Sequence, residues 1–490
     1  MTALTGQLYI GGQWVDGEGE ALRSVSPSNG ETVWQGKAAS KAQVELAVAQ
    51  AQNNYGRWSQ MPLQSRVEIC ARFAELVGER KEELARLIAS ENGKTLWDAR
   101  TEAGAVVGKL KFSLQAQGER AGEKHSEMAG ATASLRHRPH GVMAVYGPYN
   151  FPAHLPNGHI TPALLAGNTV VFKPSEQTPA VAEWMVRVWE EAGIPAGVLS
   201  LVQGEAPVGI ALADAEINGL LFTGSSPTGK LLHEQLGGRP DVLLALELGG
   251  NNPLVVCGAQ DVKATAYEII QSAYISAGQR CTCARRLIVV EDAQTSVLLE
   301  RLAEMARQLK VGDPLAEEQP FMGPLVSNKE AQRLLDAQQM LLDKGAKPLV
   351  KMERLDDDLP YVSAGLLDVS EVAERPDEEY FGPLLQVIRV STFEEAIIEA
   401  NNTQYGLSAG LLSAEREKYD LFVQRVHAGI INWNRQTTGA SGSAPFGGVG
   451  LSGNHHPAGY YAADYCAFPV ASVECDALAL PEAIAPGVSV

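Results

Sequence analysis

A series of short, continuously apolar runs, separated by helical patterns, most constrains what this chain can fold into. The runs cover residues 142–145, 169–172, 198–202, 219–222, 243–246 and 254–256. Strands that are apolar without alternation are covered on both faces, which is typical of parallel sheets with crossover helices. One such helix begins at Thr178-Pro179 and ends at Gly193. The pattern therefore predicts an α/β fold with a parallel sheet.

Three further regions complete the predicted organisation. Residues 63–92 have helical apolar spacing, with an interruption or bend near Gly78. A second strand-and-helix region follows the turn at Gly249-Gly250, and no long linker separates it from the first. Residues 133–137 and 465–480 have the composition of isolated strands, which could pair with each other or with another subunit. We expect the domains to pack directly against one another.

Composition and charge exclude several classes of protein. The chain has 490 residues, 45% of them hydrophobic, which excludes intrinsic disorder. A net charge of −18 without any run of Lys or Arg argues against a nucleic acid or an anionic membrane as partner. No apolar stretch approaches the roughly 18 residues of a membrane span, and no secretion signal is recognisable. Six scattered cysteines suit a reducing compartment, so we expect a cytoplasmic protein.

Cys281 is the first candidate for chemistry. It follows Gly278-Gln279-Arg280, a polar and flexible approach unlike a core strand, although a free cysteine is more often a buried small hydrophobic residue. Arg280 could favour the thiolate, which is the reactive form of the side chain. Cys281 and Cys283 have no His or further Cys at ligand spacing, so we predict no metal site. A working thiol is the prediction.

Glu247 is the second candidate. It ends the apolar run 243–246 and precedes Gly249-Gly250. A buried, unpaired carboxylate is costly, so this side chain must reach solvent, a partner or a cavity. A salt-bridged or edge glutamate is an equally good interpretation of the pattern. The functional alternative is a general base whose basicity is raised by a partly apolar site.

Polar groups also follow three other apolar runs. Asn150 comes after the run 142–145 and is either a turn residue or a fixed amide donor for an oxyanion. Lys173 and Glu176 come after the run 169–172 and are either a solvated strand end or hydrogen-bond partners of a ribose. Residues 224–229 join a strand to a helix, and a glycine-containing turn there forms an anion site by geometry, although the motif itself is weak. Strand ends of this kind line the ligand crevice of open α/β sheets.

Taken in order along the chain, these positions resemble the aldehyde dehydrogenase superfamily. The resemblance runs from Tyr9-Ile10-Gly11-Gly12-Gln13-Trp14 to Pro445-Phe446-Gly447-Gly448, and it includes Glu379-Tyr380-Phe381-Gly382-Pro383, which is similar to the Glu-x-Phe-Gly-Pro of that family. Two departures are Tyr149, where the family commonly has Trp, and Ser276, where many members have Asn. The resemblance implies an α/β fold with a Rossmann-type parallel-sheet cofactor domain, an α/β catalytic domain and a small oligomerisation β-element.

The resemblance also implies domain limits. It places an NAD-binding domain at residues 1–249, with residues 121–141 in the oligomerisation element. A catalytic domain then covers residues 250–450, and a C-terminal segment with an oligomerisation strand covers residues 451–490. By the same resemblance, the enzyme is a homodimer or a homotetramer.

Site roles follow from the same resemblance. Cys281 is the nucleophile that attacks an aldehyde, and the amide of Asn150 holds the oxyanion together with the backbone N–H of Cys281. Glu247 activates the water that hydrolyses the thioester. Glu176 disfavours a 2′-phosphate, so NAD is the expected cofactor. The residues expected to contact NAD are Lys173, Glu176, Gly224, Ser225, Gly229, Glu379 and Phe381.

Within the superfamily, the runs around Asn150, Glu247 and Cys281 are similar to the N-succinylglutamate 5-semialdehyde dehydrogenases, which serve arginine breakdown by the succinyltransferase route. The implied substrate is an acidic aldehyde, so a local cation must offset the negative field of the protein. Arginine suits carboxylates because its fork donates two parallel bonds. Arg280 or Arg435, with His154 as a weaker third, is the candidate for this contact.

Three alternatives remain at this stage. A CoA-acylating semialdehyde dehydrogenase would release the thioester to CoA, although a water-activating base such as Glu247 is superfluous there. An NAD-dependent dehydrogenase of another semialdehyde, succinic or glutamic, keeps the same chemistry. A non-enzymatic binding or structural protein is disfavoured because both Cys281 and Glu247 are present.

Overall fold

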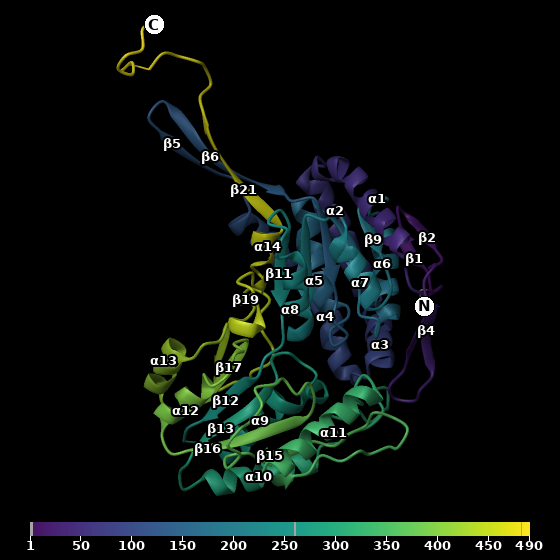
Figure 1. Cartoon of the computed structure of the whole chain (residues 1–490), viewed down its shortest axis with the longest axis vertical. Coiled ribbons are helices and arrows are strands. Elements are labelled where there is room, and N and C mark those ends of the chain that lie inside the picture. The colour runs from purple at the N-terminus through teal and green to yellow at the C-terminus, as the bar shows by residue number, and fades with distance from the viewer. Residues whose placement is uncertain (1–2, 259–260, 482) are drawn as a thin grey trace.

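The computed structural model describes residues 3–258, 261–481 and 483–490, and these residues form two seven-stranded sheets, each flanked by helices (Figure 1). The first sheet has five parallel strands and an antiparallel edge formed by β1 and β2. Its strands in spatial order are β11 (Leu243–Glu247), β10 (Gly219–Thr223), β7 (Val142–Tyr146), β8 (Thr169–Lys173), β9 (Leu199–Leu201), β1 (Leu8–Ile10) and β2 (Gln13–Val15). The predicted parallel sheet is therefore confirmed.

The helices around the first sheet bury its apolar strands. The predicted bend in residues 63–92 is a break at Arg80, two residues after Gly78, and Gly93 ends the second helix in a left-handed conformation at φ 78°. The helices are α1 (Lys41–Ser59), α2 (Leu63–Glu79), α3 (Lys81–Asn92), α4 (Leu96–Arg120), α5 (His154–Ala166), α6 (Pro179–Glu191), α7 (Ala206–Asp214) and α8 (Ser226–Leu236). None of the helices in the described part of the chain combines the length and apolar character that a membrane crossing requires.

The second sheet lies on the other side of the molecule. Its strands in spatial order are β14 (Lys347–Val350), β15 (Gly365–Asp368), β16 (Leu384–Val390), β13 (Ala284–Val290), β12 (Asn252–Val256), β17 (Ser408–Leu412) and β18 (Ile430–Trp433). The helices of this region are α9 (Val262–Tyr274), the 3-10 turn η1 (Ile275–Gly278), α10 (Thr295–Arg307), α11 (Asn328–Asp343), α12 (Phe393–Ala400) and α13 (Arg416–Arg425). The predicted domain limits, among them the boundary after residue 249, stay predictions.

A three-stranded antiparallel sheet projects from the body (Figure 1). It consists of β5 (Lys124–Met128), β6 (Ala131–Pro139) and β21 (Ala467–Glu474), so the two isolated strands pair with each other within the chain. The predicted strand over 465–480 is wrong at both ends, because Tyr465 belongs to the short helix α14 and β21 ends at Glu474, where its pairing with β6 stops at Thr132. The remaining elements are β3 (Ala21–Val25) with β4 (Thr32–Lys37), β19 (Pro445–Phe446) with β20 (Ala458–Gly459), η2 (Gly450–Ser452) and α14 (Ala462–Tyr465).

Strand register brings the candidate residues to one edge of the first sheet. Lys173 lies opposite Tyr146 at the ends of β8 and β7, and Thr223 lies opposite Glu247 at the ends of β10 and β11. These are carboxyl ends of parallel strands, where open α/β sheets bind their ligands. The fold therefore converts positions far apart in the sequence into a shared edge.

The buried carboxylate of Glu183 fastens the N-terminal segment to this sheet. Its side chain on α6 accepts hydrogen bonds from the backbone N–H groups of Thr5 (2.7 Å) and Gly6 (3.1 Å) and from Trp34 Nε1 (2.6 Å). Arg187 pairs with the same carboxylate at 2.7 Å. Removal of this carboxylate leaves three donors and a guanidinium without their acceptor.

We expect Glu183→Ala to lower the free energy of unfolding by about 3 kcal/mol, because buried donors and a charge lose their partner. Glu191→Ala, on the same helix, removes the surface ion pair with Arg80 and should cost less than about 1 kcal/mol. Urea denaturation followed by circular dichroism measures both. Equal losses in the two variants would contradict the assigned role of Glu183.

Candidate active site

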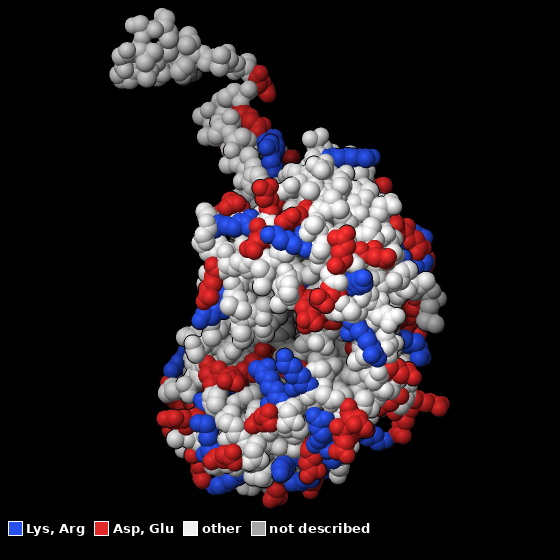
Figure 2. All heavy atoms as spheres, turned by 45° about the vertical axis from the view of Figure 1, so that its right-hand side comes forward, with Lys and Arg blue, Asp and Glu red and all other residues white. Residues whose placement is uncertain are grey.

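A cavity of about 800 Å³ opens along the carboxyl edge of the first sheet and reaches the second. The face in Figure 2 is hollowed between the two halves of the molecule, and Lys and Arg side chains there are interspersed with Asp and Glu instead of forming a basic patch. The sequence-predicted residues that line the cavity are Cys281, Glu247, Asn150, Lys173, Glu176, Gly224, Ser225, Glu379 and Phe381. Gly229, Arg280, Arg435 and His154 are not among its lining residues.

Cys281 follows a turn with an uncommon backbone conformation. Ser276, Ala277 and Gly278 all have positive φ, at 54°, 52° and 70°. Serine and alanine rarely adopt this left-handed conformation, and each costs on the order of 1–3 kcal/mol there. The turn is the local feature that directs the chain from α9 towards the thiol.

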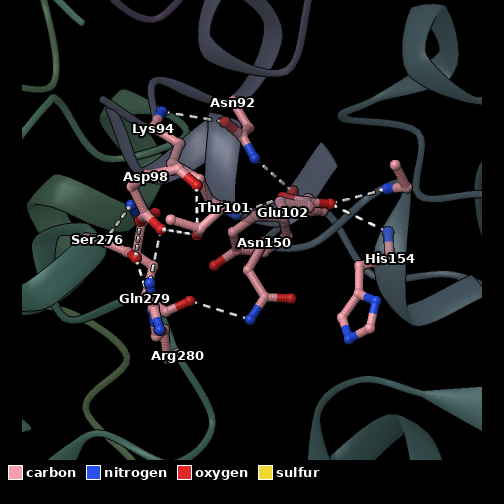
Figure 3. A network of polar contacts seen from close by, with 12 residues as sticks. Asn92, Lys94, Asp98, Thr101, Glu102, Asn150, His154, Ser276, Gln279 and Arg280 are labelled. Atoms are coloured by element: carbon pink, nitrogen blue, oxygen red, sulfur yellow. Dashed lines mark hydrogen bonds and ion pairs between the residues drawn. The ribbon is translucent and has the colours of Figure 1, made fainter. Parts of the chain in front are cut away.

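Buried charged side chains hold this turn in place (Figure 3). The hydroxyl of Ser276 donates to Asp98 Oδ2, and Arg280 Nη2 pairs with Asp98 Oδ1 at 2.6 Å. Arg280 Nε also donates to Ser276 Oγ at 2.8 Å, and the Asp98 side chain is fully buried. Asp98 lies on α4, so a helix beside the first sheet fixes the loop that carries the thiol.

Two further residues anchor the cysteine loop, and sequence reasoning did not assign them this role. Asn252 donates from Nδ2 to the carbonyl oxygens of Cys281 (2.7 Å) and Cys283 (2.8 Å). Arg285, fully buried, donates to the carbonyls of Gly278 (2.7 Å) and Arg280 (2.9 Å). In the sequence, Asn252 is a second asparagine after Glu247 and Arg285 is a second arginine after Arg280. That proximity was the only signal, and the carbonyl groups to which they donate are visible only in the fold.

The ionisation of Cys281 differs from the prediction. Burial and the nearby carboxylates of Glu379 and Glu247 raise the pKa of the Cys281 thiol to about 12. Arg280 does not lower this pKa, because its guanidinium is committed to Asp98. The prediction that Arg280 favours the thiolate is therefore wrong for this arrangement, and the thiol must lose its proton in the course of the reaction.

Asn150 lies next to the cysteine loop. Its side-chain Nδ2 donates to the carbonyl of Gln279 at 3.0 Å, and the residue is only 8% exposed (Figure 3). Gln279 is in turn fixed, since its Oε1 accepts from the N–H of Val326 at 3.0 Å. The side-chain amide of Asn150 is thus held against the carbonyl of Gln279, which lies two residues before Cys281 in the sequence, and Asn150 lines the cavity.

Glu247 is a buried carboxylate with one free oxygen. Its side chain accepts a hydrogen bond at Oε1 from the N–H of Ala458 (3.1 Å), while Oε2 has no partner within the residues described. Burial raises the pKa of Glu247 well above its ordinary value. A carboxylate with raised basicity and an unpartnered oxygen, on a residue that lines the cavity, is suited to accept a proton.

The cofactor candidates form a groove along the strand ends. Lys173 Nζ lies 4.0 Å from Glu176 Oε2, and burial lowers the pKa of the lysine. Ser225 caps α8 by accepting from the N–H of Thr228. Residues 225–228 line the cavity, so the positive end of this helix lies at the cavity wall. Gly229 lies inside α8, where a Cβ would come within 2.4 Å of Leu248, which gives it a packing role. This groove has the anion-binding helix and ribose partners that a dinucleotide requires.

Glu379 and Phe381 close the other side of the groove. Glu379 Oε1 accepts from the N–H of Gly250 at 3.1 Å, and a Cβ on Gly249 would come within 1.7 Å of Glu379 Oε2. Glycine at 249 therefore lets this carboxylate approach the backbone. The ring of Phe381 meets that of Tyr149 edge to face, with centroids 6.1 Å apart.

The three predicted substrate cations differ in their surroundings. Arg280 is paired with Asp98, and its side chain is 12% exposed. Burial, with Lys109 and Lys94 nearby, lowers the pKa of His154 to about 4, so its ring carries no charge at neutral pH. Arg435 is exposed and has no ion pair within the described ranges. Of the three, only Arg435 presents an unpaired charge.

Comparison with known proteins supports the arrangement. The pattern described as "Aldehyde dehydrogenase family" matches residues 14–468. N-succinylglutamate 5-semialdehyde dehydrogenase of Paraburkholderia xenovorans is 56% identical over 98% of this chain and 99% of that protein. The protein of the same name from Chromobacterium violaceum is 54% identical with the same coverage.

Solved structures agree with the sequence relatives. PnpE from Pseudomonas sp. WBC-3 superimposes with a TM-score of 0.91, at 31% identity over 98% of this chain and 99% of that one. PnpE in complex with nicotinamide adenine dinucleotide gives a TM-score of 0.90 with the same identity and coverage. The sequence match over most of the chain, the shared fold and the thiol, amide and carboxylate on one cavity establish that the chain belongs to the aldehyde dehydrogenase family.

Proposed function

We propose that this enzyme oxidises N-succinyl-L-glutamate 5-semialdehyde to N-succinyl-L-glutamate with NAD, in arginine catabolism by the succinyltransferase route. The observation that carries the proposal is that the Cys281 thiol and the Glu247 carboxylate share one cavity with a strand-end groove. The relatives that are more than half identical over nearly their whole length bear the name of this activity. Both observations point to a cysteine-dependent dehydrogenase.

Cys281 begins the reaction as the nucleophile. Its sulfur bonds to the aldehyde carbon as its proton passes to solvent in the open cavity, and the carbonyl π electrons move to oxygen, which Asn150 Nδ2 and the backbone N–H of Cys281 stabilise. NAD, when bound in the groove, supplies the acceptor for the hydride that leaves this carbon. The chain then holds the acyl group as a thioester on Cys281.

Glu247 completes the reaction by activating water. Its carboxylate takes a proton from water, the water oxygen bonds to the thioester carbon, and the C–S bond breaks to return the thiol. The unpartnered Oε2 is the oxygen available for this transfer.

The groove favours NAD as the cofactor. Lys173 ends β8, Glu176 follows it, and both line the cavity, which supports the proposal that they bind the adenosine ribose and that the carboxylate of Glu176 repels a 2′-phosphate. In this proposal the pyrophosphate binds at the start of α8, where Ser225 lines the cavity and the helix N-terminus favours an anion. Glu379 and Phe381 line the opposite side, where the nicotinamide ribose would lie.

Recognition of the acidic substrate requires a cation near the thiol. Arg435 remains the candidate with an uncommitted guanidinium, in the loop that follows β18. Arg280 and His154 stay weaker candidates because one is paired and the other is uncharged. A carboxylate bound by an exposed arginine is consistent with a substrate that carries its charges away from the aldehyde.

We also propose a cytoplasmic homo-oligomer, either a dimer or a tetramer. The projecting sheet of β5, β6 and β21 exposes the apolar side chains of Val473 (66%) and Met128 (50%). Exposed apolar side chains on a projecting sheet with unpaired edge strands favour pairing with a second copy.

A panel of semialdehydes tests the substrate. We expect N-succinylglutamate 5-semialdehyde to give a kcat/KM for NADH formation at least about tenfold above succinic and glutamic semialdehydes, because a missing carboxylate contact costs about 1.4 kcal/mol or more. The released product should be the free acid whether or not CoA is present. A higher kcat/KM for an unsuccinylated semialdehyde, or release of an acyl-CoA, would contradict the proposal.

The raised pKa of Glu247 predicts a pH dependence of thioester hydrolysis. Only the ionised carboxylate accepts a proton, so hydrolysis should slow as pH falls through a midpoint above the ordinary carboxyl pKa of about 4.3. Glu247→Gln should slow hydrolysis about 10²- to 10⁴-fold and abolish that limb, while the first NADH per thiol still forms rapidly. Stopped-flow measurement of NADH and of acid release separates the two steps. A limb that persists in the variant would show that another group is the base.

A further inference from the structure

Lys109 is a buried lysine that the proposed reaction does not use. It lies on α4, is 6% exposed, and donates from Nζ to the carbonyl of Gly459 at 2.9 Å. No carboxylate pairs with it in residues 3–258, 261–481 and 483–490. Burial lowers the pKa of Lys109 to about 8, so the ammonium is still the main form at pH 7. Burial of a charge without a carboxylate partner is costly, so its hydrogen bond to Gly459 is expected to have a structural role.

Other buried cations in the described chain have fuller surroundings. Lys94 pairs with the buried Glu102, and Arg285 lies 3.9 Å from Glu379. Arg66 has no carboxylate, but it donates to three backbone carbonyls. Lys109, by contrast, directs its charge at a single carbonyl oxygen, 350 residues away in the sequence.

That carbonyl belongs to the strand that contacts the general base. Gly459 is the second residue of the two-residue strand β20, and the first is Ala458, whose N–H donates to Glu247 Oε1 at 3.1 Å. A Cβ on Gly447, in the adjoining loop, would come within 2.8 Å of the same oxygen, so the carboxylate has little room on this side. Two neighbouring residues of one short strand therefore connect Lys109 to Glu247.

Besides Lys109, the short strand is held by burial of Ala458 and by hydrogen bonds within residues 444–461, among them the N–H of Tyr461 to the carbonyl of Ala458 at 3.3 Å. β20 pairs with β19 in only two residue pairs, and the N–H of Tyr460 donates to the carbonyl of Ala444 at 3.1 Å. Gly459 itself has a positive φ of 70°, which glycine adopts without strain, so the turn at this residue leaves its carbonyl free to accept from Lys109. A charge-assisted hydrogen bond from a buried ammonium is among the stronger restraints available to such a segment.

We propose that Lys109 is a positioning residue for thioester hydrolysis: it fixes β20 so that the Ala458 N–H holds Glu247 Oε1 and leaves Oε2 directed at the attacking water. The inference rests on the proposed function, since it assigns Glu247 the role of base. Lys109 exchanges no proton in this scheme and does not contact the aldehyde. Its loss loosens the orientation of Glu247 and slows the second half of the reaction alone.

Lys109→Met tests this with a side chain of similar length and no donor. We expect hydrolysis of the thioester to slow about tenfold to hundredfold, the range set by loss of one hydrogen bond from a charged group. The rapid formation of one NADH per thiol and the kcat/KM for the acidic aldehyde should stay within about twofold of the wild type, because neither depends on the hydrolysis step. Hydroxylamine, which attacks thioesters without a base, should release the acyl group from both enzymes at equal rates.

Matched variants separate positioning from general damage. Lys111→Met makes the same change at an exposed position of α4 and should behave as the wild type. Lys109→Arg keeps a donor that reaches Gly459 and should retain hydrolysis within about threefold, which guards against a folding defect in the methionine variant. Lys109→Met added to Glu247→Gln should slow hydrolysis no further, because both changes act through one carboxylate.

The contrary results are equally distinct. Wild-type hydrolysis in Lys109→Met, an equal defect in Lys111→Met, or an additive effect with Glu247→Gln would each overturn the proposal. A KM that rises for acidic but not for uncharged aldehydes would instead make Lys109 a substrate cation. Absence of NADH formation by the wild-type enzyme with every aldehyde would refute the proposed function, whereas the outcomes above concern Lys109 alone.

Discussion

The buried carboxylate of Asp98 is the interaction on which the site depends. The turn before the thiol has three consecutive residues at positive φ, two of them not glycine, and such a backbone persists only where its surroundings over-determine it. Asp98 stabilises this backbone by accepting a hydrogen bond from the Ser276 hydroxyl and by forming an ion pair with Arg280. Serine at position 276 is compatible with this turn because its short hydroxyl reaches the carboxylate. Because the Arg280 guanidinium is paired with Asp98, it stabilises the turn and does not activate the Cys281 thiol.

Side chains of helix α4 fix several segments of the site. Asp98 in its first turn fixes the cysteine loop, and Glu102, one turn later, accepts from the N–H groups of Ala153 and His154 at the start of α5 (3.0 and 3.1 Å). Lys109, two turns further, holds the strand that contacts Glu247. Side chains at these intervals lie near one face of a helix. One helix thus contacts the segments that carry the proposed nucleophile, the proposed oxyanion donor and the proposed base.

Much of the fold followed from local patterns. The continuously apolar runs predicted the parallel strands, and the polar residues after them predicted the ligand edge, because both depend on residues close in sequence. The order of Asn150, Glu247 and Cys281 along the chain indicated the family. Their exact orientation could not be predicted, since it depends on contacts such as Lys109 to Gly459 that span 350 positions. The ionisation of Cys281 was mispredicted for the same reason: the partner of its neighbour Arg280 lies 182 positions away.

Direct detection of the acyl group on one cysteine tests the central claim, that Cys281 is the nucleophile and that Glu247 promotes hydrolysis of the thioester on it. Glu247→Gln is incubated with the semialdehyde and NAD, quenched in acid, digested and examined by peptide mass spectrometry. The account predicts a stoichiometric acyl adduct on the sulfur of Cys281, which is absent when NAD is omitted. An adduct on Cys283 or another cysteine, or none at all while NADH accumulates, would contradict it.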